Sequence, residues 1–242
     1  MPLDVTSPES IAAAAELSKQ LTDGKLDFLI NNAGCGYFSP LLDVDIEKAK
    51  KQYDVNVWGM LAVTQAFFPL VRAARGTVVN QASMSGVQGF NRPFLGIYSS
   101  SKSAVISISN TMRIELAPFD IKVVTLITTS VKTEFFNHKT GGFILNDSVY
   151  APIKEKADKI MQSSDYAKSG PDRYEIAQDT IDELMRDATP IFIRKGYMAT
   201  LVALIFWLFP QWMLDRQSSK SGNLDRLKQS SANEDIKSRK LE

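Results

Sequence analysis

Short apolar runs alternate along this chain with longer helical patterns. The expected strands cover residues 26–30, 77–80, 122–127 and 191–193. The expected helices cover residues 11–21, 45–72, 98–116 and 171–188. Short buried strands separated by helices are typical of a parallel sheet with helices on both faces. The sequence therefore predicts an α/β fold built on a doubly wound parallel sheet.

Composition excludes several functional classes. The 242 residues carry 28 basic and 27 acidic side chains, and a net charge of +1 gives no electrostatic reason to bind nucleic acid. The single cysteine, Cys35, and the single histidine, His138, cannot supply a disulfide framework or a Cys/His metal site. A Ser-His-Asp hydrolase would need His138, and the chain has no nucleophile elbow. We expect a cytoplasmic protein without a metal centre.

Tyr98 and Lys102 stand four residues apart within an expected helix. Side chains at this spacing share a helix face, so the ammonium lies near the phenol. A nearby cation favours the tyrosinate and lowers the pKa of the phenol. The pair then suits general acid–base chemistry, although the same spacing is common on solvated helices.

Polar motifs follow two of the expected strands. Asn31-Asn32-Ala33-Gly34 follows the first strand, and Ser83-Met84-Ser85-Gly86 follows the second, shortly before the Tyr98 helix. Ligands bind outside the carboxyl ends of the strands in open parallel sheets. Together with Asn56-Val57-Trp58-Gly59 and Tyr98-x-x-x-Lys102, these motifs resemble the short-chain dehydrogenase/reductase family in order and spacing. The resemblance extends from residue 4 to about residue 135 and implies a Rossmann-like fold.

The resemblance implies a catalytic set. Tyr98 would exchange a proton with the substrate oxygen, and Lys102 would lower its pKa and hydrogen-bond the nicotinamide ribose. Ser83 would hydrogen-bond the substrate carbonyl or hydroxyl, with Ser85 as the alternative, and Asn56 would hold a water in a proton relay. The residues implied in cofactor binding are Asp4, Asn32, Tyr98, Lys102, Val131 and Thr133. Taken singly, Asn32 also fits a turn, Asn56 an ordinary helix position and Thr133 a helix cap.

The sequence departs from the family's pattern in two places. No glycine-rich loop precedes Asp4, and the family's first strands, which would flank residues 26–30, are missing from the chain. An incomplete gene model, an inactive remnant or a partner that completes the sheet would each account for this. Thr128-Thr129 stands where the family often has Pro-Gly, so Thr129 is expected to crowd the nicotinamide.

The chain divides into three expected regions. Residues 1–197 form the partial Rossmann-like domain, residues 198–214 are nearly all apolar, and residues 215–242 form a disordered tail. The apolar region reaches only the lower length limit for a spanning helix and is interrupted by Pro210. Its tryptophans and basic flanks suit a membrane interface, and a lid or core helix is the alternative. Its position resembles the apolar end of fungal acyl-dihydroxyacetone phosphate reductases.

The resulting hypothesis is an NADP-dependent oxidoreductase, with NAD not excluded, that acts on a small apolar carbonyl or alcohol. We expect a homo-oligomer in the cytoplasm, with attachment to a lipid droplet or the endoplasmic reticulum surface as an extension of the membrane hypothesis. The alternative is a catalytically silent protein that dimerises through the helices at residues 45–72 and 98–116.

Overall fold

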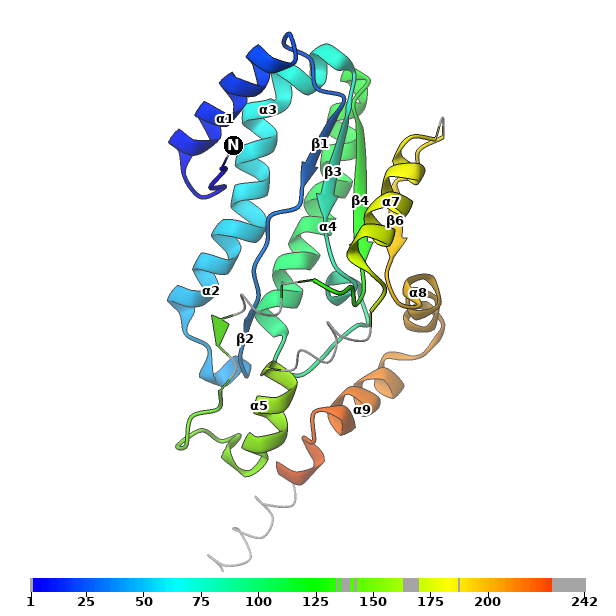
Figure 1. Cartoon of the computed structure of the whole chain (residues 1–242). Helices are drawn as coiled ribbons and strands as arrows, with labels where there is room; N and C mark the ends of the chain where they lie inside the picture. Colours follow the sequence, from blue (N-terminus) through cyan, green and yellow to red (C-terminus); the bar gives the residue numbers. More distant parts are fainter. Residues whose placement is uncertain are drawn as a thin grey trace, which may run out of the picture.

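The computed structural model describes residues 2–133, 135, 140–141, 143–162, 170–186 and 188–227. Its main sheet has four parallel strands in the order β1-β3-β4-β6 (Figure 1). The strands are β1 (Phe28–Asn31), β3 (Thr77–Gln81), β4 (Lys122–Thr128) and β6 (Phe192–Lys195). This arrangement confirms the predicted α/β class, and β1 lies at one edge of the sheet.

Helices cover both faces of this sheet. The α-helices of the described residues are α1 (Pro8–Leu21), α2 (Ile46–Tyr53), α3 (Met60–Ala74), α4 (Gly96–Leu116), α5 (Lys154–Gln162), α7 (Arg173–Leu184), α8 (Ala199–Leu208) and α9 (Gln211–Ser221), of which α5 and α9 lie beyond the end of the sheet (Figure 1). Val78 packs in one core cluster with residues of α1, α3 and α4, whereas its neighbour Val79 packs with Leu184 of α7. Successive side chains of a strand point to opposite faces, so buried β-branched residues serve both cores.

Several short elements complete the fold. Strands β2 (Tyr37–Phe38) and β5 (Thr140–Gly141) pair in a second small sheet that the sequence did not predict. The 3₁₀ turns are η1 (Leu41–Asp43), η3 (Met84–Gly86), η4 (Ala117–Phe119) and η6 (Ala151–Ile153). Two-residue strands carry too little periodicity to be recognised in a sequence.

The helix expected at residues 45–72 forms, but its middle is unusual. A π-helical segment, η2 (Asp54–Gly59), joins α2 to α3. A Cβ at Gly59 would lie 2.8 Å from Val5, so the absent side chain lets the N-terminal segment approach the π segment. Length and composition alone would let Ile46–Ala74 cross a membrane, but α3 places Val63 and Phe67 in the core. This packing assigns the helix to the interior of the fold.

A polar network ties the sheet to the helices behind it. Asn31 at the end of β1 donates to Asn80 Oδ1 at 2.8 Å and to Thr64 Oγ1 at 2.9 Å. Asn80 in turn donates to Ser109 Oγ at 2.9 Å. All four residues are buried, so each polar group depends on its partner. Asn31 therefore fixes the end of β1, which leaves Asn32 at the start of the following loop.

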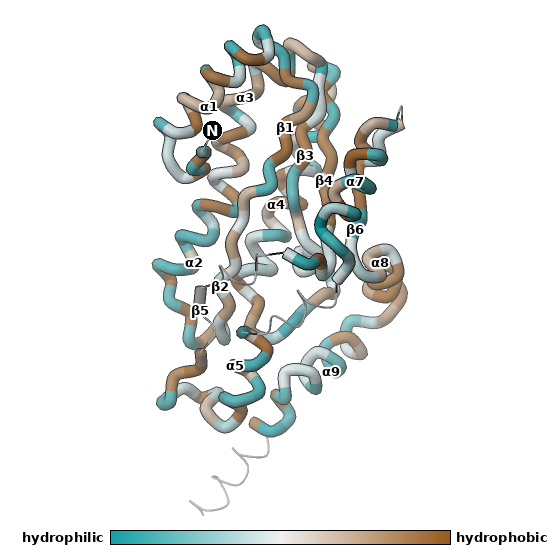
Figure 2. Tube along the Cα trace, in the orientation of Figure 1, coloured by the Kyte–Doolittle hydropathy of each residue, from teal (hydrophilic) through white to brown (hydrophobic). Residues whose placement is uncertain are grey.

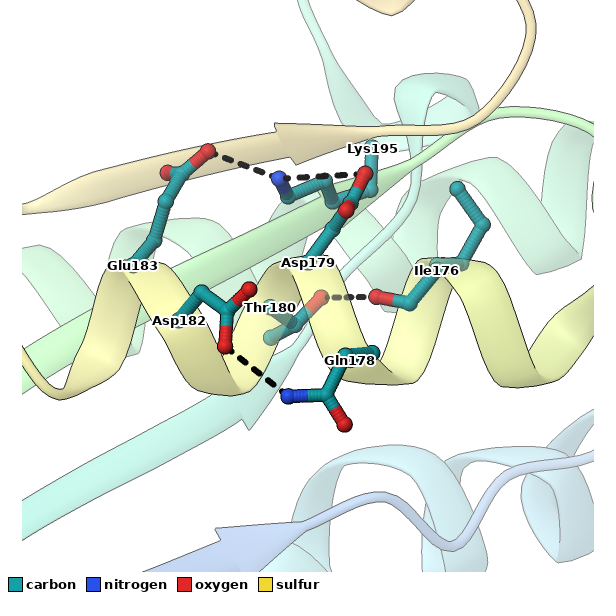
Figure 3. Close-up of polar contacts among 7 residues, drawn as sticks. All are labelled: Ile176, Gln178, Asp179, Thr180, Asp182, Glu183 and Lys195. Carbon is teal, nitrogen blue, oxygen red and sulfur yellow. Dashed lines mark hydrogen bonds and ion pairs between the residues drawn. The ribbon is translucent and has the colours of Figure 1, made fainter.

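Ion pairs join α7 to β6 in the C-terminal half of the chain. Lys195 on β6 makes ion pairs with Glu183 at 2.7 Å and Asp179 at 3.9 Å, both on α7 (Figure 3). Its side chain is largely buried. Lys195 is therefore engaged within the fold, and of the two basic residues that precede the apolar region only Arg194 is exposed.

The apolar region at residues 198–214 forms α8 and the first turn of α9, and Phe209-Pro210 separates the two helices at the proline that was expected to interrupt it. The disordered tail predicted from residue 215 is wrong for residues 215–221, which complete α9. Leu214 packs near Gly89, and Leu224 and Leu227 pack in a core cluster, so a few apolar side chains order this polar stretch. Residues 228–242 lie outside the described residues.

Candidate active site

The predicted motifs meet at the carboxyl ends of β1 and β3. The loop after β1 supplies Gly34 and Cys35, and the turn after β3 supplies Ser83. The first turns of α4 carry Tyr98 and Lys102, and the π segment carries Asn56. Contacts between these elements place the residues around one point.

Tyr98 is buried in an aromatic setting. Its ring meets Phe38 edge-on, with 5.7 Å between centroids, and lies 5.6 Å from the ring of Phe135. The Ser83 hydroxyl is a hydrogen-bond partner of the phenol. The turn after β3 thus supplies a polar partner of the phenol, and the described apolar cluster packs around its ring.

Lys102 lies one helical turn beyond Tyr98 and is 3% exposed. Its Nζ donates to the carbonyl oxygen of Gln81 at 2.9 Å, which anchors it at the end of β3. A Cβ at Gly34 would lie 3.4 Å from this Nζ, so the loop after β1 passes close to the ammonium. An ammonium has three donor hydrogens, and the bond to Gln81 uses one of them.

Burial dominates the titration of both groups. Desolvation raises the pKa of Tyr98 from 10.0 to about 12, against a smaller lowering by Ser83. Desolvation also lowers the pKa of Lys102 from 10.5 to about 8. Burial thus outweighs the lowering of the phenol pKa that was expected from Lys102, and that role of Lys102 stays a prediction. The physical reason is that α4 removes both groups from water, which disfavours the charged form of each.

Asn56 holds the loop after β1. Its Oδ1 accepts from the Cys35 amide at 2.8 Å, and its Nδ2 donates to the Cys35 carbonyl at 3.0 Å and to Ser101 Oγ at 3.0 Å. This two-way contact resembles a backbone pairing made by a side chain. Asn56 thus connects the π segment, the loop of Gly34 and helix α4, and π segments often occur at functional sites.

Ser83 rather than Ser85 lies beside the phenol. Ser83 caps η3, and its Oγ accepts from the amide of Ser85 at 3.1 Å. Gly86 closes this turn against α4, where a Cβ would lie 2.5 Å from the carbonyl carbon of Lys102. The Ser-x-x-Gly spacing therefore has a direct cause, because the glycine lets the turn that carries Ser83 pack on the helix that carries Tyr98.

The other predicted residues lie farther out. Asn32 is exposed in the loop before Gly34. Asp4 is exposed, and its carboxylate accepts from the amide and hydroxyl of Thr6, which lowers its pKa. Val131 and Thr133 are half-buried in the loop after β4. His138 lies outside the described residues.

Thr129 contacts the segment after β6. Its amide donates to the carbonyl of Lys195 at 2.9 Å, and its hydroxyl donates to the carbonyl of Tyr197 at 3.0 Å. A Cβ at Gly196 would lie 2.5 Å from this hydroxyl, so the two loops are closely packed. The Thr129 hydroxyl is therefore held by the segment after β6, and the crowding of the nicotinamide by Thr129 stays a prediction.

Sequence reasoning missed the apolar cluster around Tyr98. Its buried members are Phe38, Phe94, Tyr98, Ile144, Ile153, Ala157 and Met161, and Phe135, Tyr150, Leu224 and Leu227 pack against it. These residues come from five separate segments, and no local pattern joins them. Cys35 was also missed as a neighbour of Lys102; burial raises the pKa of its thiol, and the ammonium opposes that rise.

Comparisons with known proteins agree on one family. The family model for short chain dehydrogenases matches residues 1–141. A short-chain dehydrogenase of Penicillium ochrochloron is 36% identical over 225 residues, which is 93% of this chain and 80% of that protein. An NADPH-dependent 1-acyldihydroxyacetone phosphate reductase of Schizosaccharomyces pombe is 36% identical over 157 residues, covering 63% of this chain and 52% of that protein.

Solved structures show the same fold. A short-chain dehydrogenase from Streptomyces avermitilis superposes with a TM-score of 0.68 at 24% identity, covering 100% of this chain and 80% of that one. An NADPH-bound carbonyl reductase from chicken fatty liver superposes with a TM-score of 0.53 at 26% identity, covering 55% of this chain and 58% of that one.

Proposed function

The chain belongs to the short-chain dehydrogenase family, and on that premise we propose that it reduces an apolar carbonyl compound with NADPH, using Tyr98 as the general acid. It is an oxidoreductase of the family's nicotinamide-dependent type. The observation that carries the finer proposal is the position of Tyr98, a buried phenol with Ser83 as its polar partner and Lys102 one turn away.

The residues present fit the nicotinamide end of such a cofactor. The Lys102 ammonium is buried and uses one of its three donors on Gln81, which leaves capacity for ribose hydroxyls. Gly34 lies above it and has no side chain to block an approach. Asn32, exposed in the same loop, would line the ribose, and Val131 and Thr133 would line the carboxamide side. The bound cofactor supplies the hydride.

The protein's own contribution is to position a proton. A phenol with a raised pKa stays protonated at neutral pH, which is the form needed to donate a proton to a carbonyl oxygen. Ser83 would hydrogen-bond the same oxygen and orient it toward Tyr98. Lys102, whose ammonium lies close by, would stabilise the tyrosinate left after donation. Asn56 acts through the loop of Cys35, which it holds against α4.

The substrate side of Tyr98 favours an apolar compound. The side chains of Phe38, Phe94 and Phe135 lie around the phenol, and η6 and α5 add Ile153 and Met161 to the same cluster. Transfer of apolar surface into such a setting is favourable by about 25 cal/mol for each Å² buried. NADPH is proposed because it is named for the 36% identical reductase and for the carbonyl reductase that is 26% identical.

The experiment that tests this proposal is a kinetic assay on the full chain. NADPH and NADH would each be titrated with a panel of aldehydes and ketones of increasing apolar size. We expect saturable oxidation of NADPH that strengthens with apolar length. Turnover that prefers NADH would contradict the cofactor assignment, and a preference for small polar carbonyls would contradict the substrate class.

The buried ammonium predicts a pH dependence of stability. The folded protein releases the Lys102 proton near pH 8, while the unfolded chain keeps it until about 10.5. Because the unfolded state then binds more protons, stability rises with pH through this window. Above pH 10 the sign reverses, since folded Tyr98 keeps its proton until about 12. We expect wild-type protein to gain roughly 2 kcal/mol between pH 8 and 10.

Urea unfolding at several pH values measures this gain. The matched variant is Lys102→Met, which keeps the aliphatic stem and removes the charge. Its stability should be nearly flat from pH 8 to 10 and higher than that of the wild type at pH 7. A rise of equal size in both proteins would show that another group is responsible.

The proposal includes a homo-oligomer in the cytoplasm. Trp58 is 55% exposed beside a shallow hollow lined by Ile46, Ala49 and Tyr53, and Ile114 of α4 is also exposed. Apolar side chains of this size on the outer face of α2–α4 favour self-association. Light scattering should give twice the mass of the chain, and Trp58→Glu should give a monomer. A wild-type monomer would contradict this part of the proposal, and cell fractionation tests the location.

A further inference from the structure

The segment after β6 combines an inward and an outward apolar face. Inward, Ala199 and Val202 belong to a core cluster, and Phe206 meets the ring of Phe90 with 4.9 Å between centroids. Outward, four exposed residues recur at i, i+3, i+4 and i+7 along α8, which places them on one face of the helix. They are Leu201, Leu204, Ile205 and Leu208.

The exposed apolar surface continues past the helix. Trp207 is 79% exposed and Trp212 is 65% exposed, and Phe209 and Met213 between and beside them are also exposed. Figure 2 shows α8 mainly in brown at the outer side of the molecule. No aspartate, glutamate, lysine or arginine occurs from residue 196 to residue 214. A continuous apolar patch of this kind marks an interaction site.

Three properties of the patch point to a lipid surface as its occupant. Tryptophan side chains are enriched where apolar and aqueous regions meet, and both tryptophans of this segment are exposed. The exposed basic residues Arg194, Arg216 and Lys220 flank the patch on either side and match anionic headgroups. The ten residues of α8 span about 15 Å, half of a hydrocarbon core, so the helix suits lying in the interface.

The same segment is fastened to the loop between Ser83 and Tyr98. Phe206 and Leu214 pack over Gly89, Asn91 donates to Asp215 Oδ1 at 3.4 Å, and Gly222 packs on Pro93. Farther along, Leu224 and Leu227 enter the apolar cluster that contains Tyr98. Residues 199–227, which we call the C-terminal arm, therefore connect the exposed patch to the loop between Ser83 and Tyr98 through contacts on both sides of the patch.

We propose that the C-terminal arm binds an anionic lipid surface through the exposed face of α8 and the tryptophans that follow it, and so holds the Tyr98 site next to that surface. Binding itself does not depend on turnover. Because α8 is too short to span a bilayer and contacts it through one apolar face, the attachment is peripheral and reversible. Docking of a second copy on the same face is the competing outcome.

Vesicle binding with brominated lipids tests the proposal on the full chain. Three single-tryptophan forms keep Trp58, Trp207 or Trp212 and carry phenylalanine at the other two positions. Vesicles of phosphatidylcholine and phosphatidylserine with brominated acyl chains quench tryptophans that enter the interface. We expect quenching of Trp207 and Trp212 but not of Trp58. Equal quenching at all three positions, or none with folded protein, would overturn the proposal.

Matched variants separate lipid binding from the alternatives. Leu208→Ser on the patch should weaken flotation with vesicles about tenfold, whereas Leu21→Ser, which is also exposed and lies at the end of α1, should not. Arg216→Gln with Lys220→Gln should weaken binding to anionic vesicles more than to neutral ones. The leucine variants and the variant without the two basic residues should all keep turnover of a water-soluble aldehyde. Conversion of a dimer to a monomer by Leu208→Ser, without any vesicle binding by the wild type, would assign the patch to a second copy.

Discussion

Replacing Tyr98 by phenylalanine is expected to lower kcat for carbonyl reduction by roughly a hundredfold to ten-thousandfold, the usual contribution of a positioned general acid. The substitution removes one oxygen and keeps the ring, so the edge-on contact with Phe38 at 5.7 Å and the packing against Phe135 remain. The loss should appear in kcat rather than in cofactor affinity, because Lys102 and the Gly34 loop are unchanged.

The matched control is Tyr150→Phe. Tyr150 packs edge-on against Phe94 in the same apolar cluster, and its hydroxyl has no part in the proposed chemistry. Its turnover should stay within about twofold of the wild type. Steady-state oxidation of NADPH followed by absorbance measures both variants. Residual activity of Tyr98→Phe close to that of the wild type would show that another group delivers the proton.

Replacing Gly86 by valine is expected to damage both stability and turnover. The first atom of the new side chain would lie 2.5 Å from the Lys102 carbonyl carbon and 2.7 Å from its oxygen. These are backbone atoms of α4 and cannot rotate away, so the turn and the helix must separate. Overpacking of this kind costs about 1–3 kcal/mol. A displacement of about 1 Å between Ser83 and Tyr98 can cost a further hundredfold in rate.

Urea unfolding and kcat together measure the effect, and Ser85→Ala is the control within the same turn. Ser85 is half-buried, and its amide bond to Ser83 survives the change, so stability and turnover should both be near those of the wild type. This control also decides between the two serines. A large loss of kcat in Ser85→Ala, with little loss in Ser83→Ala, would transfer the substrate contact to Ser85.

The regular elements could be predicted because each has a strong local pattern. The runs at residues 77–80 and 122–127 are short, apolar and β-branched, and both became central strands. The motif residues Ser83, Tyr98 and Lys102 could be grouped because parallel strands bring their carboxyl ends to one edge. The sequence could not reveal the π segment at Asn56, since a shift to i→i+5 bonding leaves no periodic trace over six residues.

The pKa values of Tyr98 and Lys102 could not be predicted from the sequence, for a different reason. The spacing of Tyr98 and Lys102 reveals that they are close, but the pKa of each depends on how much water reaches it. That access is set by Phe38, Phe135 and the loop of Gly34, which come from other parts of the chain. The ordering of residues 215–227 was likewise missed, because it depends on distant partners: Gly222 packs on Pro93, and Leu224 and Leu227 pack in the cluster that contains Phe94.

The most direct test of the central claim is isotope transfer from the cofactor. The full chain would be mixed with NADPH deuterated at the transferable position and with a long-chain aldehyde, and the alcohol product would be analysed by mass spectrometry. We expect one deuterium on the carbinol carbon in the wild type and at most a trace of product with Tyr98→Phe. Folded protein that binds NADPH but yields no deuterated alcohol with any carbonyl of the panel would contradict it.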